Sequence, residues 1–389
     1  MHDADLVYSI FLIFTGAALF ATAALYARQA MLVAYIVLGA VTGPSALGLV
    51  SDPELIENIS EVGIIFLLFL LGLNLYPQKL LQLFRETTLV TLASSVLFCA
   101  LGYGIARAFG VGSVDALLVG VATMFSSTIV SLKLLPTTVL HHRHTGEVIV
   151  SVLLLQDLIA ILAMLFLQAG AQGEVPWSST ALTVLALPLL VALAFVGERY
   201  LLLKLFVRFD RIQEYVFLLA VGWCLGIAQA GNAMGLSYEI GAFIAGIAVA
   251  TSPIARHIAD TLKPLRDFFL VMFFFALGAG FDFGAAHDML VPAMVLAAAV
   301  IFGKPAVYRV LFVAQAESAA LAWETGVRLG HLSEFSLLLV FVAVEVGTMG
   351  GKAASMVQLA TIMTFVASSY LVVLRYPTPI ALSDRLRRD

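Results

Sequence analysis

Charged residues are scarce in this sequence. Only 12% of its 389 residues are Asp, Glu, Lys or Arg, whereas soluble domains contain about 25%. Hydrophobic residues make up 61% of the chain, and its mean hydropathy is +1.03. The composition therefore excludes an ordinary soluble domain and indicates an all-α polytopic membrane protein.

Cysteine is also scarce. Cys99 and Cys224 both lie inside apolar runs, so no disulfide framework is predicted. Room for a soluble module is lacking as well, because thirteen helical spans would use about 260 residues and leave about ten for each connection. We therefore expect no separate catalytic domain and no enzymatic activity, and nothing in the chain indicates a bound cofactor.

Long apolar runs, separated by charged or Gly/Pro-rich breaks, predict thirteen transmembrane helices. The predicted spans are 7–25, 31–50, 57–76, 88–109, 114–135, 146–170, 179–197, 212–230, 236–251, 265–282, 289–312, 327–347 and 354–374.

Lys and Arg fall almost entirely on one side of this topology. With the N-terminus outside, 18 of the 21 basic residues lie on cytoplasmic segments, Arg107 and Lys352 lie outside, and Lys304 falls within a span. Short loops rich in Lys and Arg stay in the cytoplasm. The charge pattern therefore predicts an external N-terminus and a cytoplasmic C-terminus.

Thirteen spans divide as six, one and six, which allows the second set of six to be inverted relative to the first. We thus expect one transmembrane transport domain over residues 1–389. Its parts would be a first inverted repeat at 1–171, a linker helix and loop at 172–211, a second inverted repeat at 212–375 and a cytoplasmic tail at 376–389.

The fifth and twelfth spans correspond in this scheme, and both are polar in the middle. Polar interruptions at corresponding positions are typical of broken helices that form an ion site near the membrane midplane. The alternative is that the hydroxyls bond to their own helix or join neighbouring helices. The residues concerned are Thr123, Ser126, Ser127 and Thr128 in one span and Gly330, His331, Ser333 and Glu334 in the other.

Asp157 is the most informative charge. It lies well inside the sixth span, in SVLLLQDLIAILAMLFL, where an ionisable side chain costs several kcal/mol and usually serves a function. Its neighbour Gln156 lies at nearly the same depth and brings a neutral amide oxygen. Together these residues favour a cation site over a structural ion pair.

Lys304 is a second deep charge, in AAAVIFGKPAVYRV. It can pair with Asp157 or Glu334, or extend to the cytoplasmic surface. Glu334 can bind a cation, hold Lys304 or satisfy a helix end, and we favour a structural role. His141, His142 and His144 cluster before the sixth span, where an interfacial loop is a better interpretation than a zinc site.

Several ordered segments resemble the membrane domain of bacterial monovalent cation:proton antiporters, most closely the potassium-efflux, KefC-like type. These segments are AYIVLGAVTGPSALGLV (34–50), EVGIIFLLFLLGLNL (61–75), FSSTIVSLKLL (125–135), LLLQDLIAI (153–161), YEIGAFIAGIAVA (238–250) and GHLSEFSLLLV (330–340).

The resemblance implies an NhaA/NapA-like antiporter fold with two crossed, discontinuous helices. It also implies a homodimer in the bacterial cytoplasmic (inner) membrane, surrounded by lipid, and a cytosolic nucleotide-binding regulatory domain beyond residue 389. Asp157 matches the ion-carrying aspartate of the family, Gln156 the residue before it, and Lys304 the basic residue of the eleventh span. No nucleic-acid partner is expected.

Sodium-transporting relatives usually carry Asp-Asp where this chain has Gln156-Asp157, so we expect exchange of K⁺ for H⁺. Asp157 would hold either ion in competition, with Gln156, Ser127 and Thr128 as further ligands and Lys304 and Glu334 as supporting charges. With one carboxylate, the cycle would be one for one and electroneutral. The alternatives are a Na⁺/H⁺ antiporter and a gated K⁺ channel, although no TVGYG-like filter is visible.

Overall fold

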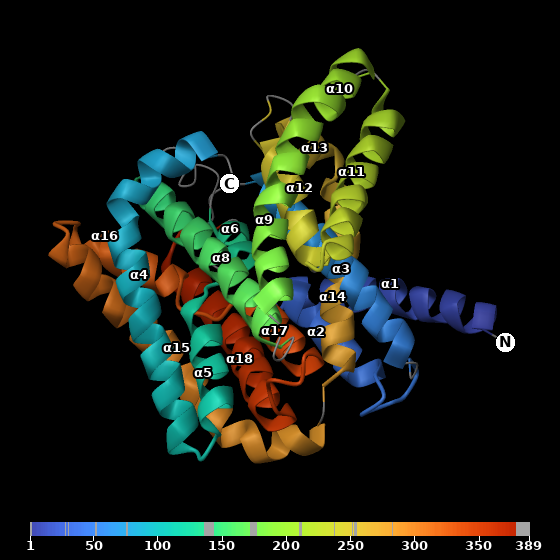
Figure 1. Cartoon of the computed structure of the whole chain (residues 1–389). Coiled ribbons are helices and arrows are strands. Elements are labelled where there is room, and N and C mark those ends of the chain that lie inside the picture. Colours follow the sequence, from blue (N-terminus) through green and yellow to red (C-terminus); the bar gives the residue numbers. More distant parts are fainter. Residues whose placement is uncertain are drawn as a thin grey trace. The chain divides into compact units, whose positions relative to one another are not determined.

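The computed structural model describes residues 2–27, 29, 31–50, 53–74, 77–135, 144–171, 177–209, 212–236, 238–250, 252, 255–281 and 283–378. The regular elements in these ranges are helices, as Figure 1 shows, which confirms the all-α fold class.

The chain divides into two compact units. The first combines residues 1–8, 52–81 and 172–276. Its helices are α3 (Pro53–Asn74), α9 (Trp177–Gly197), the π-helical turn η1 (Glu198–Leu202), α10 (Leu203–Phe209), α11 (Gln213–Ala233), α12 (Tyr238–Ala250), α13 (Ala255–Thr261) and most of α14 (Lys263–Ala279).

The second unit combines residues 9–51, 82–171 and 277–389. It holds most of α1 (His2–Tyr26) and of α4 (Pro77–Ala108) and all of α2 (Met31–Thr42), α5 (Ser113–Met124), α6 (Thr128–Lys133), α8 (His144–Ala171), α15 (Phe283–Ala314), α16 (Ala319–Arg328), α17 (Glu334–Glu345) and α18 (Gly351–Arg375).

Every predicted span overlaps one helix or two consecutive helices. In the described part of the chain, eight helical segments are long and apolar enough to cross a membrane. The multi-pass character is therefore confirmed, whereas the count of thirteen crossings stays a prediction. The eight segments are 7–26, 87–108, 113–131, 144–164, 186–209, 213–233, 287–314 and 351–375.

Glycine brings α3 and α12 together in the first unit. A Cβ at Gly246 would overlap the Phe69 carbonyl, and one at Gly72 would lie 2.5 Å from the Phe243 carbonyl oxygen. Small residues allow this close approach of helix backbones, which is a common way to pack helices in membranes.

Two helices of the second unit are broken. The chain leaves the helical conformation at Phe125, between α5 and α6, and at residues 329–333, between α16 and α17. Serine caps restart both helices, because the Ser127 hydroxyl accepts from the Val130 N–H and the Ser333 hydroxyl accepts from the Phe335 N–H. Both interruptions that the sequence indicated are therefore confirmed.

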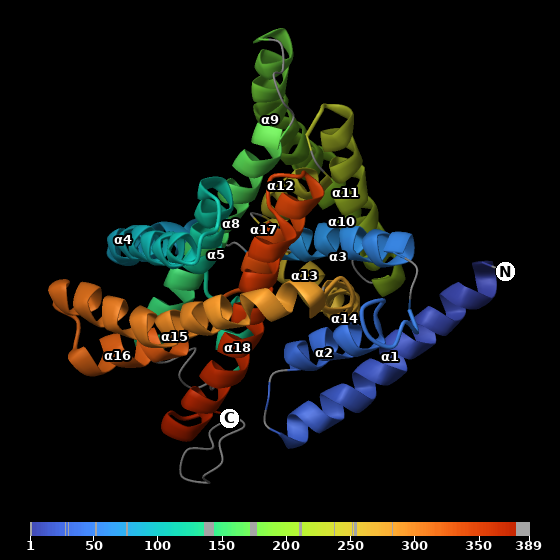
Figure 2. The ribbon, with the colours of Figure 1, turned by 90° about the horizontal axis from the view of Figure 1, so that it is seen from below.

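Helix α15 packs against α16 and α18. Figure 2 shows α15 running beside α16 and crossing α18. Tyr308 and Phe312 of α15 belong to a hydrophobic cluster with residues of α4, α8 and α16. Lys304 lies one turn before Tyr308 on the same face of α15, and it is fully buried.

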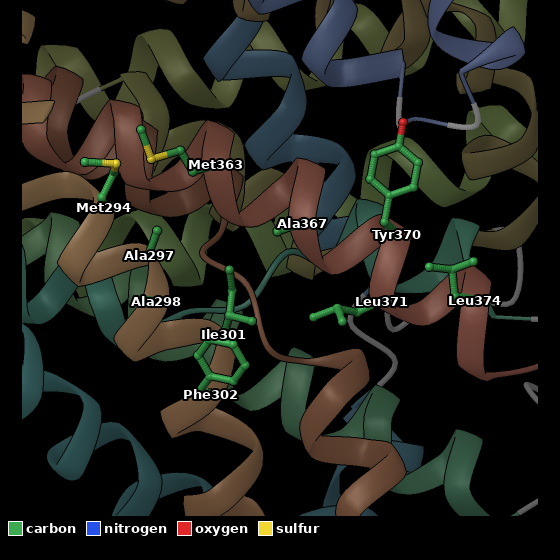
Figure 3. Close-up of a pocket in the computed structure, with 10 residues that line it drawn as sticks. All are labelled: Met294, Ala297, Ala298, Ile301, Phe302, Met363, Ala367, Tyr370, Leu371 and Leu374. Atoms are coloured by element: carbon green, nitrogen blue, oxygen red, sulfur yellow. The ribbon is translucent and has the colours of Figure 1, made fainter. Parts of the chain in front are cut away.

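An apolar groove of about 420 Å³ opens between α15 and α18 (Figure 3). Phe302 and Leu374, at its rim, are 72% and 61% exposed. Tyr370 carries the only side-chain hydroxyl in its lining, and this hydroxyl donates to the Ala27 carbonyl. Such a surface suits the hydrocarbon of a bilayer and offers no oxygen cage for an ion.

Candidate ion-binding site

The two helix breaks meet. The Ser126 hydroxyl donates to the Leu329 carbonyl (2.9 Å), and the Ser127 N–H lies 3.1 Å from both the Leu332 carbonyl oxygen and His331 Nδ1. Backbone groups that would be unsatisfied at an interrupted helix therefore find partners in the opposite break. Two segments about 200 residues apart in sequence thus form one polar centre.

Asp157 lies beside this centre on α8 and is 1% exposed. Its Oδ2 accepts a hydrogen bond of 3.0 Å from the Thr128 hydroxyl at the start of α6. Its Oδ1 is buried and has no hydrogen-bond partner. An unsatisfied buried carboxylate oxygen is costly, so this atom is the natural ligand for a proton or a cation.

Glu334 lies at the first turn of α17 and is 8% exposed. Its Oε1 accepts a hydrogen bond of 3.2 Å from the Ile129 N–H. Ile129 directly follows Thr128, which donates to Asp157. Oε2 is buried without a hydrogen-bond partner, so the structural role predicted for Glu334 accounts for only one of its oxygens.

Lys304 lies near the C-terminal ends of α5 and α16, the half-helices that come before the two breaks. Its ammonium donates to the Phe125 carbonyl (2.6 Å), to the Ser126 hydroxyl (3.1 Å) and to the His331 carbonyl (2.9 Å). These neutral oxygens use all three of its donors, and the Phe98 ring centroid lies 5.2 Å away. In the described residues, Lys304 forms no ion pair with either carboxylate. It instead compensates the negative ends of the broken helices.

Gln156 uses its whole amide within the protein. Its Oε1 accepts from the Ser126 N–H at 3.0 Å, and its Nε2 donates to the Met124 carbonyl (3.0 Å) and to the Tyr308 hydroxyl (2.8 Å). The amide thus ties the end of α5 to α8 and α15. A role for Gln156 as an ion ligand stays a prediction that would require these bonds to rearrange.

Tyr308 was not anticipated as part of the site. It is fully buried, and its hydroxyl accepts a hydrogen bond of 2.8 Å from Gln156 Nε2. The available signal was its position four residues after Lys304, because residues i and i+4 share a helix face.

We expect Gln156→Glu to destabilise the protein. A second carboxylate oxygen would replace Nε2 and face the Met124 carbonyl without a donor, at a cost of about 1–3 kcal/mol or more for a charged group. The measurement is the melting temperature in detergent, with Gln315→Glu, at an exposed position just after the end of α15, as the control. Equal melting temperatures for both variants would contradict this account of Gln156.

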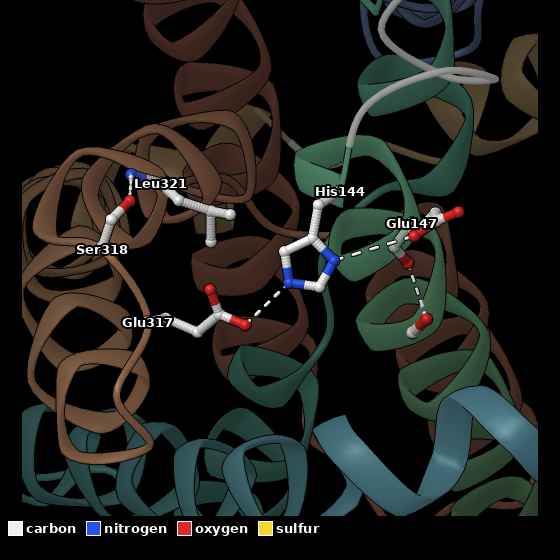
Figure 4. A network of polar contacts seen from close by, with 6 residues as sticks. His144, Glu147, Glu317, Ser318 and Leu321 are labelled. Carbon is white, nitrogen blue, oxygen red and sulfur yellow. Dashed lines mark hydrogen bonds and ion pairs between the residues drawn. The ribbon is translucent and has the colours of Figure 1, made fainter.

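His144 belongs to a separate network at the start of α8 (Figure 4). Its Nε2 lies 2.8 Å from Glu317 Oε1, and its Nδ1 lies 3.7 Å from Glu147 Oε2. Half of its side chain is exposed. The other two histidines of the predicted cluster, His141 and His142, lie outside the described residues. Within the described residues, no group of three or more metal-ligating side chains occurs.

This exposed network contributes little to stability, because water screens it. We expect His144→Ala to change the free energy of unfolding by less than about 1 kcal/mol and to leave transport within twofold of the parent. Chemical denaturation and a proteoliposome flux assay would test this. A larger loss of flux would instead make the α8 terminus part of the transport cycle.

Two crossed, interrupted helices around a buried carboxylate define a secondary transporter of cations. A family model described as "Sodium/hydrogen exchanger, transmembrane" matches residues 10–374, and the chain belongs to this family of cation:proton antiporters.

A curated relative, the iron transporter MagA of Paramagnetospirillum magneticum, is 26% identical over 375 residues, which cover 95% of this chain and 85% of MagA. Among solved structures, the sodium proton antiporter MjNhaP1 of Methanocaldococcus jannaschii at pH 8 matches with a TM-score of 0.68. That match has 15% identity and covers 94% of this chain and 96% of MjNhaP1, so it supports the antiporter fold. The closer likeness to potassium-efflux proteins stays a prediction.

Proposed function

We propose that this protein exchanges K⁺ for H⁺ across the bacterial cytoplasmic membrane, with Asp157 as the residue that binds either ion. The observation that carries the proposal is the buried Oδ1 of Asp157, which lacks a partner beside the meeting point of two broken helices. Membership of the exchanger family supports proton-coupled cation transport.

Competition for one buried site accounts for the coupling. When a proton or a cation occupies Asp157, the charge of the carboxylate is compensated. When the site is empty, the uncompensated charge of the buried carboxylate makes it unfavourable for the site to move from one side of the membrane to the other. The Thr128 hydroxyl already contacts Asp157, and Ser127 caps the same half-helix, so both are placed to replace part of the ion's water shell.

Selectivity for K⁺ rests on the neutral residue at position 156. A neutral residue at this position leaves the site with one carboxylate fewer than an Asp-Asp pair would supply. The site therefore repays less of the cost of removing water from an ion, and K⁺ is less costly to dehydrate than Na⁺. The alternative is Na⁺/H⁺ exchange, which the name of MjNhaP1 describes for that protein. We further propose an external N-terminus and a cytoplasmic C-terminus, in agreement with the distribution of Lys and Arg. The homodimer that the resemblance implies is also part of the proposal.

The test is exchange in proteoliposomes that hold a pH gradient, with external K⁺, Na⁺ or Li⁺ added in turn. Fe²⁺ forms a fourth arm because the curated relative is named an iron transporter. We expect K⁺ to dissipate the gradient at the lowest concentration. A response to Na⁺ alone would establish the alternative, and K⁺ flux without proton counter-flux would indicate a channel.

A further inference from the structure

Two carboxylates, rather than one, have an unused oxygen at this site. Asp157 Oδ1 and Glu334 Oε2 are both buried without a hydrogen-bond partner, on side chains that are 1% and 8% exposed. The charge of Glu334 also acts directly on Asp157. The structural role of Glu334, which is to accept from Ile129, leaves its second oxygen unexplained.

The first turn of α6 holds the two carboxylates in neighbouring positions. Thr128 donates its hydroxyl to Asp157 Oδ2, and the next residue, Ile129, donates its backbone N–H to Glu334 Oε1. Each carboxylate is therefore anchored through one oxygen and retains the other for a ligand. Glu334 also starts α17, so the positive N-terminal end of this half-helix lies beside the pair.

We propose that Glu334 is a second carboxylate ligand of the transported ion, so that one monovalent cation, or one proton in its place, is held between Asp157 Oδ1 and Glu334 Oε2. This inference rests on the proposed exchange function and extends it. Glu334 then determines affinity directly instead of supporting the fold alone.

Charge balance provides a second argument. Two carboxylates carry two negative charges, and the Lys304 ammonium and one bound monovalent ion carry two positive charges. The loaded site is therefore neutral as a whole. If Glu334 were uncharged, the loaded site would carry one uncompensated positive charge in the membrane interior, which is costly. Without an ion, the two carboxylates and Lys304 together carry one net negative charge. This charge opposes the movement of the empty site across the membrane.

Glu334→Gln and Glu334→Ala together separate ligand from structural roles. Gln keeps the oxygen that accepts from Ile129, whereas Ala removes it. If Glu334 binds the ion, both variants should raise the K⁺ concentration for half-maximal exchange at least tenfold. If Glu334 is only structural, the K⁺ concentration for half-maximal exchange should lie within twofold of the parent value in the Gln variant and should rise only in the Ala variant. That result would overturn the proposal. Glu345→Gln removes the same charge from the exposed end of α17 and serves as the control.

A double variant tests the charge balance. Glu334→Gln leaves one extra positive charge in the loaded site, and Lys304→Gln leaves one extra negative charge. Combining the two substitutions restores neutrality, so we expect the double variant to exchange faster than Glu334→Gln alone at saturating K⁺. A double variant slower than both single variants would refute the charge argument.

Asp157→Asn, assayed in parallel, distinguishes the two possible failures. If Asp157→Asn exchanges like the parent, the proposed function itself fails. If it is inactive while Glu334→Gln behaves like the parent, only the present inference fails.

If Glu334→Gln does not fold, Glu334→Asp and Glu334→Asn take its place, and the measurement is the rise in melting temperature on adding K⁺ in detergent. Only the Asp variant should retain that rise, and equal rises in both would overturn the proposal.

Discussion

Asp157→Asn is expected to abolish cation-dependent proton movement while the protein still inserts into the membrane. Asparagine keeps an oxygen that can accept from Thr128, so the local fold should persist. It removes the negative charge and the site of proton binding, and no other group in the described residues offers an unused oxygen on α8 at this depth. We expect the rate of exchange in proteoliposomes to fall at least a hundredfold.

Asp288→Asn is the matched control for Asp157→Asn, because Asp288 is an exposed acid paired with Lys352 at 3.0 Å. It should retain the parent rate. Circular dichroism and the melting temperature would establish that both variants are folded. Exchange near the parent rate in Asp157→Asn would exclude this residue as the ion carrier.

Lys304→Gln is expected to produce the largest loss of stability among these substitutions. The ammonium donates three buried hydrogen bonds that join the ends of both broken helices, and the shorter glutamine cannot form all of them. A hydrogen bond from a charged group contributes about 1.5–3 kcal/mol, so we expect a loss of roughly that size or more. Exchange should be slower but measurable.

The control for Lys304 is Lys352→Gln, whose side chain is 66% exposed and whose ion pair contributes little. The measurement is the melting temperature in detergent, followed by flux in proteoliposomes. An unchanged melting temperature would contradict the structural role of Lys304. A complete loss of transport in a stable protein would instead place Lys304 within the ion cycle.

The broken helices could be predicted because their signals are local. Serine hydroxyls compete with the helix backbone and cap helix starts, so clusters such as Ser126-Ser127 and the segment 330–334 mark interruptions wherever they occur in an apolar run. The burial of Asp157 could also be predicted, because few charges remain inside a hydrophobic segment without a purpose. For Lys304, extension to the cytoplasmic surface remained an alternative.

The partners of these residues could not be predicted. Lys304 was expected to pair with Asp157 or Glu334 or to extend to the cytoplasmic surface, but its three donors bind neutral oxygens from both helix breaks. The role of Gln156 as an ion ligand stays a prediction, but the bonds of its amide to Met124 and Tyr308, which join α5 to α15, had no signal in the sequence.

Composition and periodicity by themselves determined that this protein is a multi-pass helical membrane protein, because apolar length and rare buried charges are properties of single segments. Only the tertiary structure decided that Glu334 retains an unused oxygen near Asp157. These residues are 177 positions apart, and their meeting depends on how two helix breaks exchange backbone hydrogen bonds. That arrangement has no periodic signal in the sequence, because it is formed by contacts between distant segments.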